Sequence, residues 1–287
     1  MTRNVEMKRR YLILDCNYLA HRAKYIFGDL SDRGSATGVV YGFLRDILTL
    51  RERFDTDRFL FCWDYGRNKR LDVYPEYKKH RKIEERAEEE QEFEDAFQLQ
   101  VSQLREVYLR TIGYRNIFFQ DGYESDDVMA MVCKSLLPNV DLEEAVIVTA
   151  DHDLWQSIRR NISWYDPRTR ELMTLHKFKN TYGIHPRHWA RVKAISGCTS
   201  DNVKGIVGVG DATALKYLKH ELNDTTKAYK NIKDGWKDVV LRNKPLVKLP
   251  YKGTKLVRIV KDKVTQDGWD SVCKVLGMKS IRYRNII

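Results

Sequence analysis

Three apolar runs, each too short for a helix, are followed by an aspartate. They cover residues 11–14, 58–63 and 145–150, and the aspartates that follow them are Asp15, Asp64 and Asp151. Short continuous apolar runs are typical of strands buried on both faces of a parallel sheet. A fourth run, at residues 116–120, leads into an acidic stretch. We therefore expect strands whose carboxyl ends carry acidic side chains.

Helical periodicity separates these runs. Apolar side chains recur at helical spacing over residues 39–48 and again over residues 93–108. Strands that alternate with helices predict right-handed crossovers and an α/β fold, with a mostly parallel central sheet flanked by helices. Ligands of such sheets bind beyond the carboxyl ends of the strands. This rule places the three aspartates and the acidic stretch along one edge.

The acidic stretch reads Glu124-Ser125-Asp126-Asp127 and precedes an apolar segment. A hydroxyl followed by two carboxylates is typical of the capped first turn of a helix. Capping explains Asp126 or Asp127, but three carboxylates within four residues repel one another unless a cation lies between them. Together with the strand-end aspartates, the stretch favours a metal site.

Clustered carboxylates without accompanying histidine or cysteine ligands favour a hard cation, Mg²⁺ or Mn²⁺, over zinc. Two such ions about 3.5–4 Å apart can stabilise both the attacking and the leaving oxygen of an in-line phosphoryl displacement. The pattern therefore predicts a metal-dependent phosphodiesterase with two ions.

Charge is divided unevenly along the 287 residues. The chain has a net charge of +11, and residues 221–287 hold 16 Lys and Arg against 7 Asp and Glu. A basic surface suits a polyanionic partner, so we expect an acidic site beside a phosphate-binding face and nucleic acid as the substrate.

Cysteine spacing and hydropathy bear on the compartment. The five cysteines form no C-x-x-C pair, so neither a disulfide framework nor a zinc site is predicted. No apolar run approaches the roughly 20 residues of a membrane span. We expect a cytoplasmic monomer without a membrane partner, in the host cytoplasm if a phage encodes it.

Basic residues alternate with aromatic ones over residues 67–82, where Tyr74 and Tyr77 stand among Lys and Arg. Such cations can hold phosphates while the rings stack on unpaired bases. An acidic run follows at residues 84–90, most simply a solvated helix face.

A glycine-rich turn lies between two helical patterns further along the chain. Gly205, Gly208 and Gly210 are followed by a helical stretch that contains Lys216. Glycines allow the backbone to approach a phosphate closely, and the N–H groups of the next helix point at it. A tight helix–helix turn would explain one G-x-G, but the longer pattern favours phosphate binding.

Five collinear segments carry a family resemblance: LILDCNYLAHR, FCWDYGRNKRLDVYPEYKKHRK, GYESDD, VTADHDLWQSI and ISGCTSDNVKGIVGVGDATALKYL. In these segments the chain resembles the structure-specific 5′ nucleases, the family of flap endonucleases and 5′-3′ exonucleases. It looks most like the stand-alone bacteriophage members. The resemblance spans about residues 15–218, and the remaining residues match only loosely.

The resemblance implies a PIN-like nuclease core over residues 1–180, with a helical arch at about residues 66–108. Residues 181–287 would form a mainly helical, basic region that binds duplex DNA, with a helix–turn–helix at about residues 188–220. It also implies cleavage at 5′ flaps, branches or 5′ ends in replication or repair, leaving a 5′-phosphate. RNA primer removal from an RNA–DNA hybrid and recruitment by a replication protein are further implications.

Site residues are carried over by motif. The implied ligands of a first metal ion are Asp15, Asp64, Glu124, Asp126 and Asp127. The implied ligands of a second ion are Asp151, Asp153 and Asp201. Lys78 and Arg81 match residues that contact the scissile phosphate, and Arg70 with Tyr77 would seat the single-stranded 5′ end. Gly205, Gly208, Gly210 and Lys216 would grip the duplex backbone, with a K⁺ ion in some family members.

One position departs from the family pattern. Where members commonly show S-G-D-x-x-D-N, this chain has a thiol, Cys198, in place of the first carboxylate. Because a thiol is a poor ligand for Mg²⁺, we expect weaker binding of the second ion. Two other interpretations stay open at this point. One is an RNA-cleaving nuclease of the PIN type, and the other is a branched-DNA-binding protein whose metal site has decayed.

Overall fold

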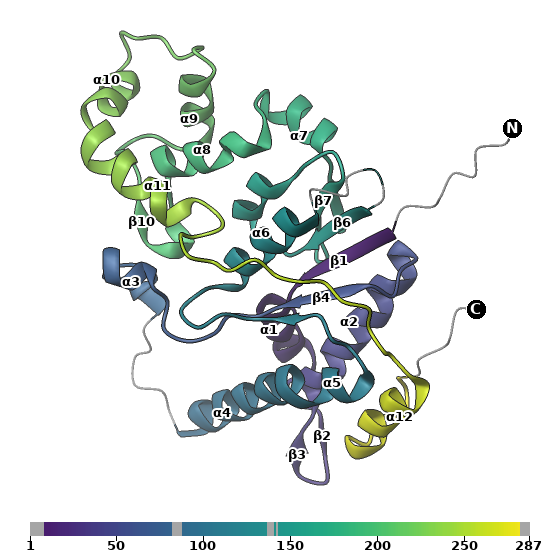
Figure 1. The fold of residues 1–287 in the computed structure, drawn as a ribbon. Helices are drawn as coiled ribbons and strands as arrows, with labels where there is room; N and C mark the ends of the chain where they lie inside the picture. Colours follow the sequence, from purple (N-terminus) through teal and green to yellow (C-terminus); the bar gives the residue numbers. More distant parts are fainter. Residues whose placement is uncertain (1–8, 82–87, 137–140, 142, 282–287) are drawn as a thin grey trace, which may run out of the picture.

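The computed structural model describes residues 9–81, 88–136, 141 and 143–281. In this part of the chain a six-stranded sheet has the order β5-β4-β1-β6-β7-β8. Its middle strands β4, β1, β6 and β7 are labelled in Figure 1. Its strands are β1 (Arg9–Asp15), β4 (Phe59–Cys62), β5 (Ile117–Phe118), β6 (Glu143–Val148), β7 (Ile162–Asp166) and β8 (Glu171–Met173). Among them β8 pairs antiparallel with β7, and the other neighbours pair in parallel. The predicted α/β fold is therefore confirmed.

Helices cover both faces of this sheet. Along β1, Leu12 and Leu14 face one hydrophobic core and Ile13 faces the other. One face is covered by α1 (Cys16–Phe27), α2 (Gly38–Phe54), α4 (Glu88–Gln103) and α5 (Leu109–Ile112). The other is covered by α6 (Ser125–Leu136), α7 (Leu175–Tyr182) and α8 (Trp189–Ser196). Each fully buried Leu or Ile contributes about 1.5–3 kcal/mol, so the two cores hold the strand ends in place.

Shorter elements complete the fold. Two small ribbons pair β2 (Ser31–Asp32) with β3 (Ser35–Ala36) and β9 (Gly197–Cys198) with β10 (Val203–Lys204). Short helices are α3 (Arg70–Val73), α9 (Asp211–Leu218), α10 (Lys227–Asp234), α11 (Leu241–Val247) and α12 (Gln266–Val275). Single-turn 3₁₀ segments occur at Lys79–Arg81, Pro186–His188 and Thr199–Asp201, and a longer one at His152–Ser157. Wider π turns lie at Leu104–Tyr108 and Trp236–Val240.

The segment predicted as an arch is described in part. Its near side consists of α3 and the turn that ends at Arg81, and its far side is α4. Residues 82–87 lie outside the described residues, and so do the side chains of Arg81, Glu88 and Glu89. Most of the acidic run at residues 84–90 is therefore not described. The arch therefore stays a prediction.

The C-terminal residues return to the sheet, and the predicted division at residue 180 stays a prediction. Beyond α11 the chain runs without helix or strand to α12, the yellow segment of Figure 1. On the way Asn116, next to β5, exchanges hydrogen bonds of 2.8 and 2.9 Å with the backbone of Val260. In α12, Trp269 is fully buried in the same core as Leu12 and Leu14 of β1. This return places Tyr251 beside α6, where its backbone N–H donates to Asp127.

The strand order reverses beside β1, because β4 and β5 lie on one side of it and β6 lies on the other. The carboxyl ends of these strands therefore meet at a topological switch point, where α/β sheets bind ligands. Within the described residues, none of the helices has the length and apolar character that crossing a membrane requires.

Candidate active site

Asp15 lies at the end of β1 and caps α1. Its Oδ1 accepts from the backbone N–H of Tyr18 at 3.1 Å and from the hydroxyl of Ser125 at 3.2 Å. Its Oδ2 accepts from the hydroxyl of Thr149 at 2.8 Å. Burial, followed by the negative charge of Asp64, raises the pKa of Asp15 to about 7. Asp15 is thus held rigidly beside a second carboxylate.

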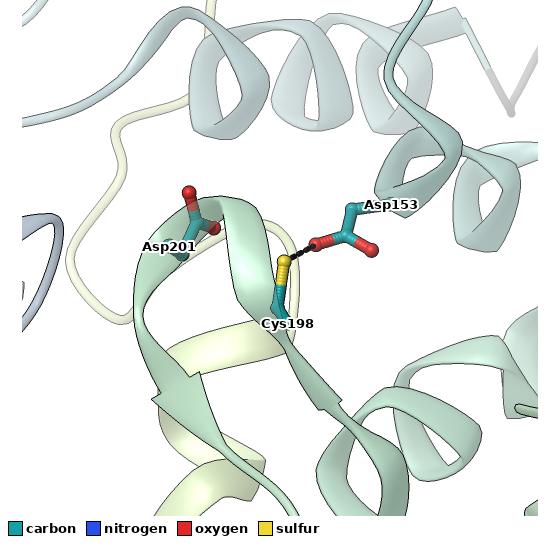
Figure 2. Close-up of side chains that lie close together, drawn as sticks. All are labelled: Asp153, Cys198 and Asp201. Carbon is teal, nitrogen blue, oxygen red and sulfur yellow. Dashed lines mark hydrogen bonds between the residues drawn. The ribbon is translucent and has the colours of Figure 1, made fainter. Parts of the chain in front are cut away.

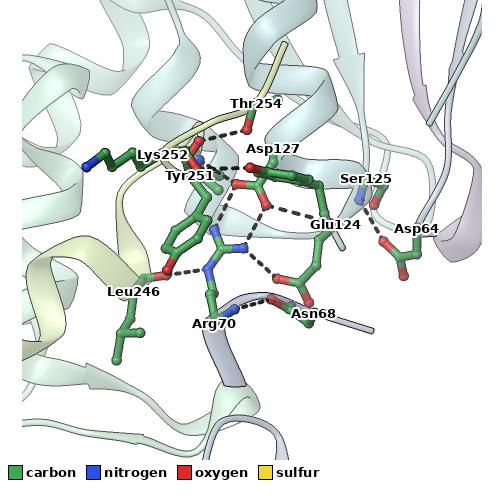
Figure 3. Close-up of polar contacts among 12 residues, drawn as sticks. Asp64, Asn68, Arg70, Glu124, Ser125, Asp127, Leu246, Tyr251, Lys252 and Thr254 are labelled. Carbon is green, nitrogen blue, oxygen red and sulfur yellow. Dashed lines mark hydrogen bonds and ion pairs between the residues drawn. The ribbon is translucent and has the colours of Figure 1, made fainter. Parts of the chain in front are cut away.

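Asp64 follows β4 and joins that strand to the start of α6. The backbone N–H of Ser125 donates to Asp64 Oδ1 at 2.6 Å (Figure 3). On its other side, the Asp64 backbone N–H donates to Asn17 Oδ1 at 2.9 Å. Helix α6 begins at Ser125, as the acidic stretch predicts. Its first N–H group therefore serves the strand-end aspartate, so a helix start and an acidic site coexist.

Glu124 precedes α6 and pairs with Lys78. The Lys78 ammonium contacts Glu124 Oε1, and it lies 3.4 Å from Asp201 Oδ1. Burial alone would raise the pKa of Glu124, but Lys78 and Arg70 outweigh it and hold the pKa below its usual range. Lys78 has a positive φ of 51°, and its N–H donates to the Asp201 carbonyl at 2.9 Å. This predicted catalytic lysine therefore lies between the carboxylates of Glu124 and Asp201.

Asp127 takes part in a buried ion pair, although the sequence suggested it as a metal ligand. Arg70 donates to both of its oxygens, at 2.6 and 2.8 Å (Figure 3). The N–H of Tyr251 adds a third bond to Asp127 Oδ1 at 2.7 Å. The side chains of Asp127 and Arg70 are 0 and 1% exposed. Because both oxygens are engaged with these donors, Asp127 supports α6 in this conformation, and its ligand role stays a prediction.

Arg70 and Tyr77 are both buried. Besides Asp127, Arg70 donates to the Leu246 carbonyl at 2.8 Å and to Glu124 at 3.3 Å. Tyr77 is 3% exposed, and its hydroxyl donates to Glu124 at 2.8 Å and contacts Asp201 at 3.2 Å. Both side chains therefore contact Glu124 in this conformation, and their role in seating the single-stranded 5′ end stays a prediction.

Asp15, Asp64 and Glu124 form a first acidic group. A second acidic group follows β6. The side chain of Asp151 accepts from the N–H of Asp153 at 2.7 Å, which starts the 3₁₀ segment His152–Ser157. Burial, followed by the charge of Asp151, raises the pKa of Asp153 to about 8. Asp201 comes from the turn between β9 and β10, so this group is assembled from two distant segments (Figure 2).

Cys198 belongs to the same group. One ligand atom from each of Asp153, Cys198 and Asp201 lies within 4.8 Å of the others (Figure 2). The Cys198 thiol donates to Asp153 Oδ2 at 3.6 Å. Burial, followed by the charges of Asp153 and Asp201, raises the pKa of this thiol. The position that departs from the family pattern therefore faces the second group directly.

Asp126 connects the two groups. Burial, followed by the charges of Asp151 and Asp15, raises its pKa well above the usual range. Its Oδ1 is buried and has no hydrogen-bond partner among the described residues. An unpaired buried oxygen is costly, and a divalent cation among these carboxylates would satisfy it. The donor set, mostly carboxylate oxygen, fits hard divalent ions.

The glycine-rich turn lies between α8 and α9. A side chain at Gly205 would collide with the backbone of Ser196 at 2.1 Å, so this glycine permits close packing of the turn. Gly208 has a φ of +76°, and the spaces above Gly208 and Gly210 are open. Lys216 is exposed on α9. The turn can thus admit a phosphate to its backbone.

Sequence reasoning assigned no site role to Thr149 or Asn17. Thr149 orients Asp15 and also accepts from the N–H of Asp151 at 3.1 Å, and Asn17 holds the backbone of Asp64. Each stands two residues from a strand-end aspartate, and that proximity is the signal that could have found them.

These features define a class: an α/β nuclease whose acidic residues meet at the carboxyl edge of a parallel sheet. The family of the 5′-3′ exonuclease N-terminal, resolvase-like domain matches residues 10–183. The chain therefore belongs to that family. Metal dependence and DNA binding follow for the class as a whole.

Relatives agree with this assignment. The chain is 28% identical over 222 residues to a 5′-3′ exonuclease of Mycoplasmopsis pulmonis, covering 77% of this chain and 69% of the relative. It is 31% identical over 216 residues to the thermostable DNA polymerase I of Thermus caldophilus, covering 75% of this chain but only 24% of that protein. A bacteriophage T5 flap endonuclease, solved with DNA and metal ions, shares the fold with a TM-score of 0.70 and 21% identity, covering 84% of this chain and 90% of that one.

Proposed function

We propose that the chain is a structure-specific 5′ nuclease that hydrolyses phosphodiester bonds at 5′ flaps, branches or 5′ ends of DNA. The carrying observation is the convergence of two acidic groups at one sheet edge. The first comprises Asp15, Asp64, Glu124 and Asp126, and the second comprises Asp151, Asp153 and Asp201 with Cys198. Such a site suits two divalent ions, Mg²⁺ or Mn²⁺. Bound ions would activate the attacking water and neutralise the leaving oxygen.

Lys78 supplies the fixed positive charge of the site. It is anchored by its backbone bond to Asp201 and is 24% exposed, so its ammonium can turn from Glu124 toward a phosphate oxygen. There it would offset charge that develops during hydrolysis. Arg81 stands three residues further along, and the same role is proposed for it on the resemblance alone.

Duplex binding is proposed for the glycine-rich turn and Lys216. The open faces of Gly208 and Gly210 and the start of α9 support a phosphate contact, and the same backbone is the proposed K⁺ position. The basic C-terminal residues would extend this contact along the duplex. Branched DNA is the proposed substrate. An RNA–DNA hybrid, a monomeric state and a replication-protein partner are proposed with it.

The ligand roles are tested by Glu124→Gln and Asp151→Asn. Each change removes a charge from one acidic group, so we expect turnover on a 5′-flap duplex to fall at least about a hundredfold. Binding of the same duplex in EDTA should stay within about twofold, because the DNA-binding face is untouched. Exposed Asp57 offers the control variant Asp57→Asn, which should cleave normally. Wild-type rates in either site variant would remove the proposed roles.

An RNA nuclease of the PIN type shares the sheet edge and is the second candidate. The glycine-rich turn between α8 and α9, together with the family assignment, favours DNA. Equal amounts of flap DNA and single-stranded RNA, offered in one reaction, separate the two. Preferential cleavage of RNA would favour the alternative, and binding without cleavage of either would favour a decayed site.

A further inference from the structure

Cys198 differs in its surroundings from other cysteines of the chain. The thiols of Cys16, Cys62 and Cys273 contact backbone carbonyls, as buried structural cysteines do. The Cys198 thiol instead contacts a carboxylate oxygen of Asp153. It also lies 3.0 Å from the hydroxyl of Ser200. A sulfur among oxygen donors is a mixed ligand set.

The distance between the sulfur and the carboxylate suits one shared ion. A thiolate and a carboxylate bind a tetrahedral Zn²⁺ at about 2.3 and about 2.1 Å, which places the two ligand atoms about 3.6 Å apart. Cys198 Sγ and Asp153 Oδ2 are 3.6 Å apart (Figure 2). A cation could therefore replace the shared proton with little movement of either side chain.

The backbone holds these ligands firmly. Cys198 lies in β9, where it pairs with Val203 of β10, and Asp153 lies in the first turn of a 3₁₀ segment capped by Asp151. Cys198 and Asp153 are each 8% exposed. Among the described residues the Oδ1 of Asp126, at the junction of the two groups, has no hydrogen-bond partner, which separately indicates that a cation belongs here.

We propose that the second group binds a thiophilic divalent transition-metal ion, such as Zn²⁺ or Co²⁺, in preference to Mg²⁺, with the Cys198 thiolate as a ligand. The proposal rests on the proposed function and names the cofactor class of the second site. On binding, the Sγ–H bond breaks, its proton passes to water, and a metal–sulfur bond forms. The all-oxygen first group keeps its preference for Mg²⁺ or Mn²⁺. The enzyme would then hold two different ions.

The test is a Co²⁺ titration of the full chain without DNA, followed by absorption. A thiolate bound to Co²⁺ gives a sulfur-to-metal charge-transfer band in the near ultraviolet, which oxygen ligands do not give. We expect the band in wild type and in Cys133→Ser, because Cys133 is buried in the core on α6. Cys198→Ser should lose the band and weaken Co²⁺ binding at least about tenfold.

The dependence of flap cleavage on Mg²⁺ concentration is the second part of the test. Cys198→Asp restores the carboxylate of the family pattern, so it should lower the Mg²⁺ concentration needed for half-maximal cleavage of a flap while also losing the band. Circular dichroism of each variant shows that it folds. Absence of the band in folded wild type, or its survival in Cys198→Ser, overturns the proposal. Flap cleavage is scored separately, so failure of the metal assignment and failure of the nuclease function are distinguishable.

Discussion

Asp15 and Asp153 couple folding to pH through their raised pKa values, about 7 and about 8. An aspartate in the unfolded chain ionises near pH ~4. Between these values the metal-free folded protein retains protons that the unfolded chain has released. Its free energy of unfolding therefore falls as pH rises through this window. Glu124, whose pKa is lowered, acts in the opposite sense at more acidic pH.

We expect Asp153→Asn to stabilise the metal-free protein, measured in EDTA, by an amount that grows as pH rises. Near pH 5 wild-type Asp153 is protonated and resembles asparagine, whereas near pH 8, close to its pKa, it begins to ionise and repels Asp151. The melting temperature of Asp153→Asn should thus exceed that of wild type by several degrees near pH 8, and by little near pH 5. The difference is the proper measure, because burial lowers the pKa of His152 and gives an opposing trend. A constant difference across this range would contradict the assignment.

The Arg70–Asp127 pair connects three elements, since α3 supplies the arginine, α6 the aspartate, and α11 the accepting Leu246 carbonyl. Breaking a buried pair leaves an uncompensated charge. Asp127→Asn should therefore lower the free energy of unfolding by about 3–5 kcal/mol in urea titration. Metal affinity of the folded variant should change little, because both Asp127 oxygens face Arg70 and Tyr251.

Asp72→Asn is the matched control for this pair. Asp72 bonds to Arg67 at 2.6 Å, but both side chains are more than half exposed. Its loss should cost about 0–1 kcal/mol. If Asp127→Asn lost metal affinity while keeping wild-type stability, Asp127 would be a ligand after all.

Elements with strong local signals were predictable from the sequence. The runs followed by Asp15, Asp64 and Asp151 form strands, as expected because they are too short for a helix and suit a strand buried on both faces. The short β7 and antiparallel β8 were not predicted, since three to five residues carry little periodicity. The buried state of Arg70 also escaped prediction, because an arginine in a basic run is normally exposed.

At the scale of the whole molecule, the two acidic groups depend on contacts between distant segments. Asp201 reaches the end of β6 only because α8 packs on the sheet, and Tyr251 reaches Asp127 only because the chain returns after α11. Such long-range returns leave no periodic signature. The ligand list therefore came from family resemblance, whereas the sheet edge itself followed from strand patterning.

The central claim is that these groups together hydrolyse a phosphodiester bond at a 5′ branch. The most direct measurement is cleavage of an end-labelled 5′-flap duplex with Mg²⁺, with Mn²⁺ and with EDTA, followed by mapping of the product ends. We predict cutting near the branch with either ion, no cutting in EDTA, and products bearing a 5′-phosphate and a 3′-hydroxyl. Cutting in EDTA, or an intact flap under saturating Mg²⁺ and Mn²⁺, would contradict the account.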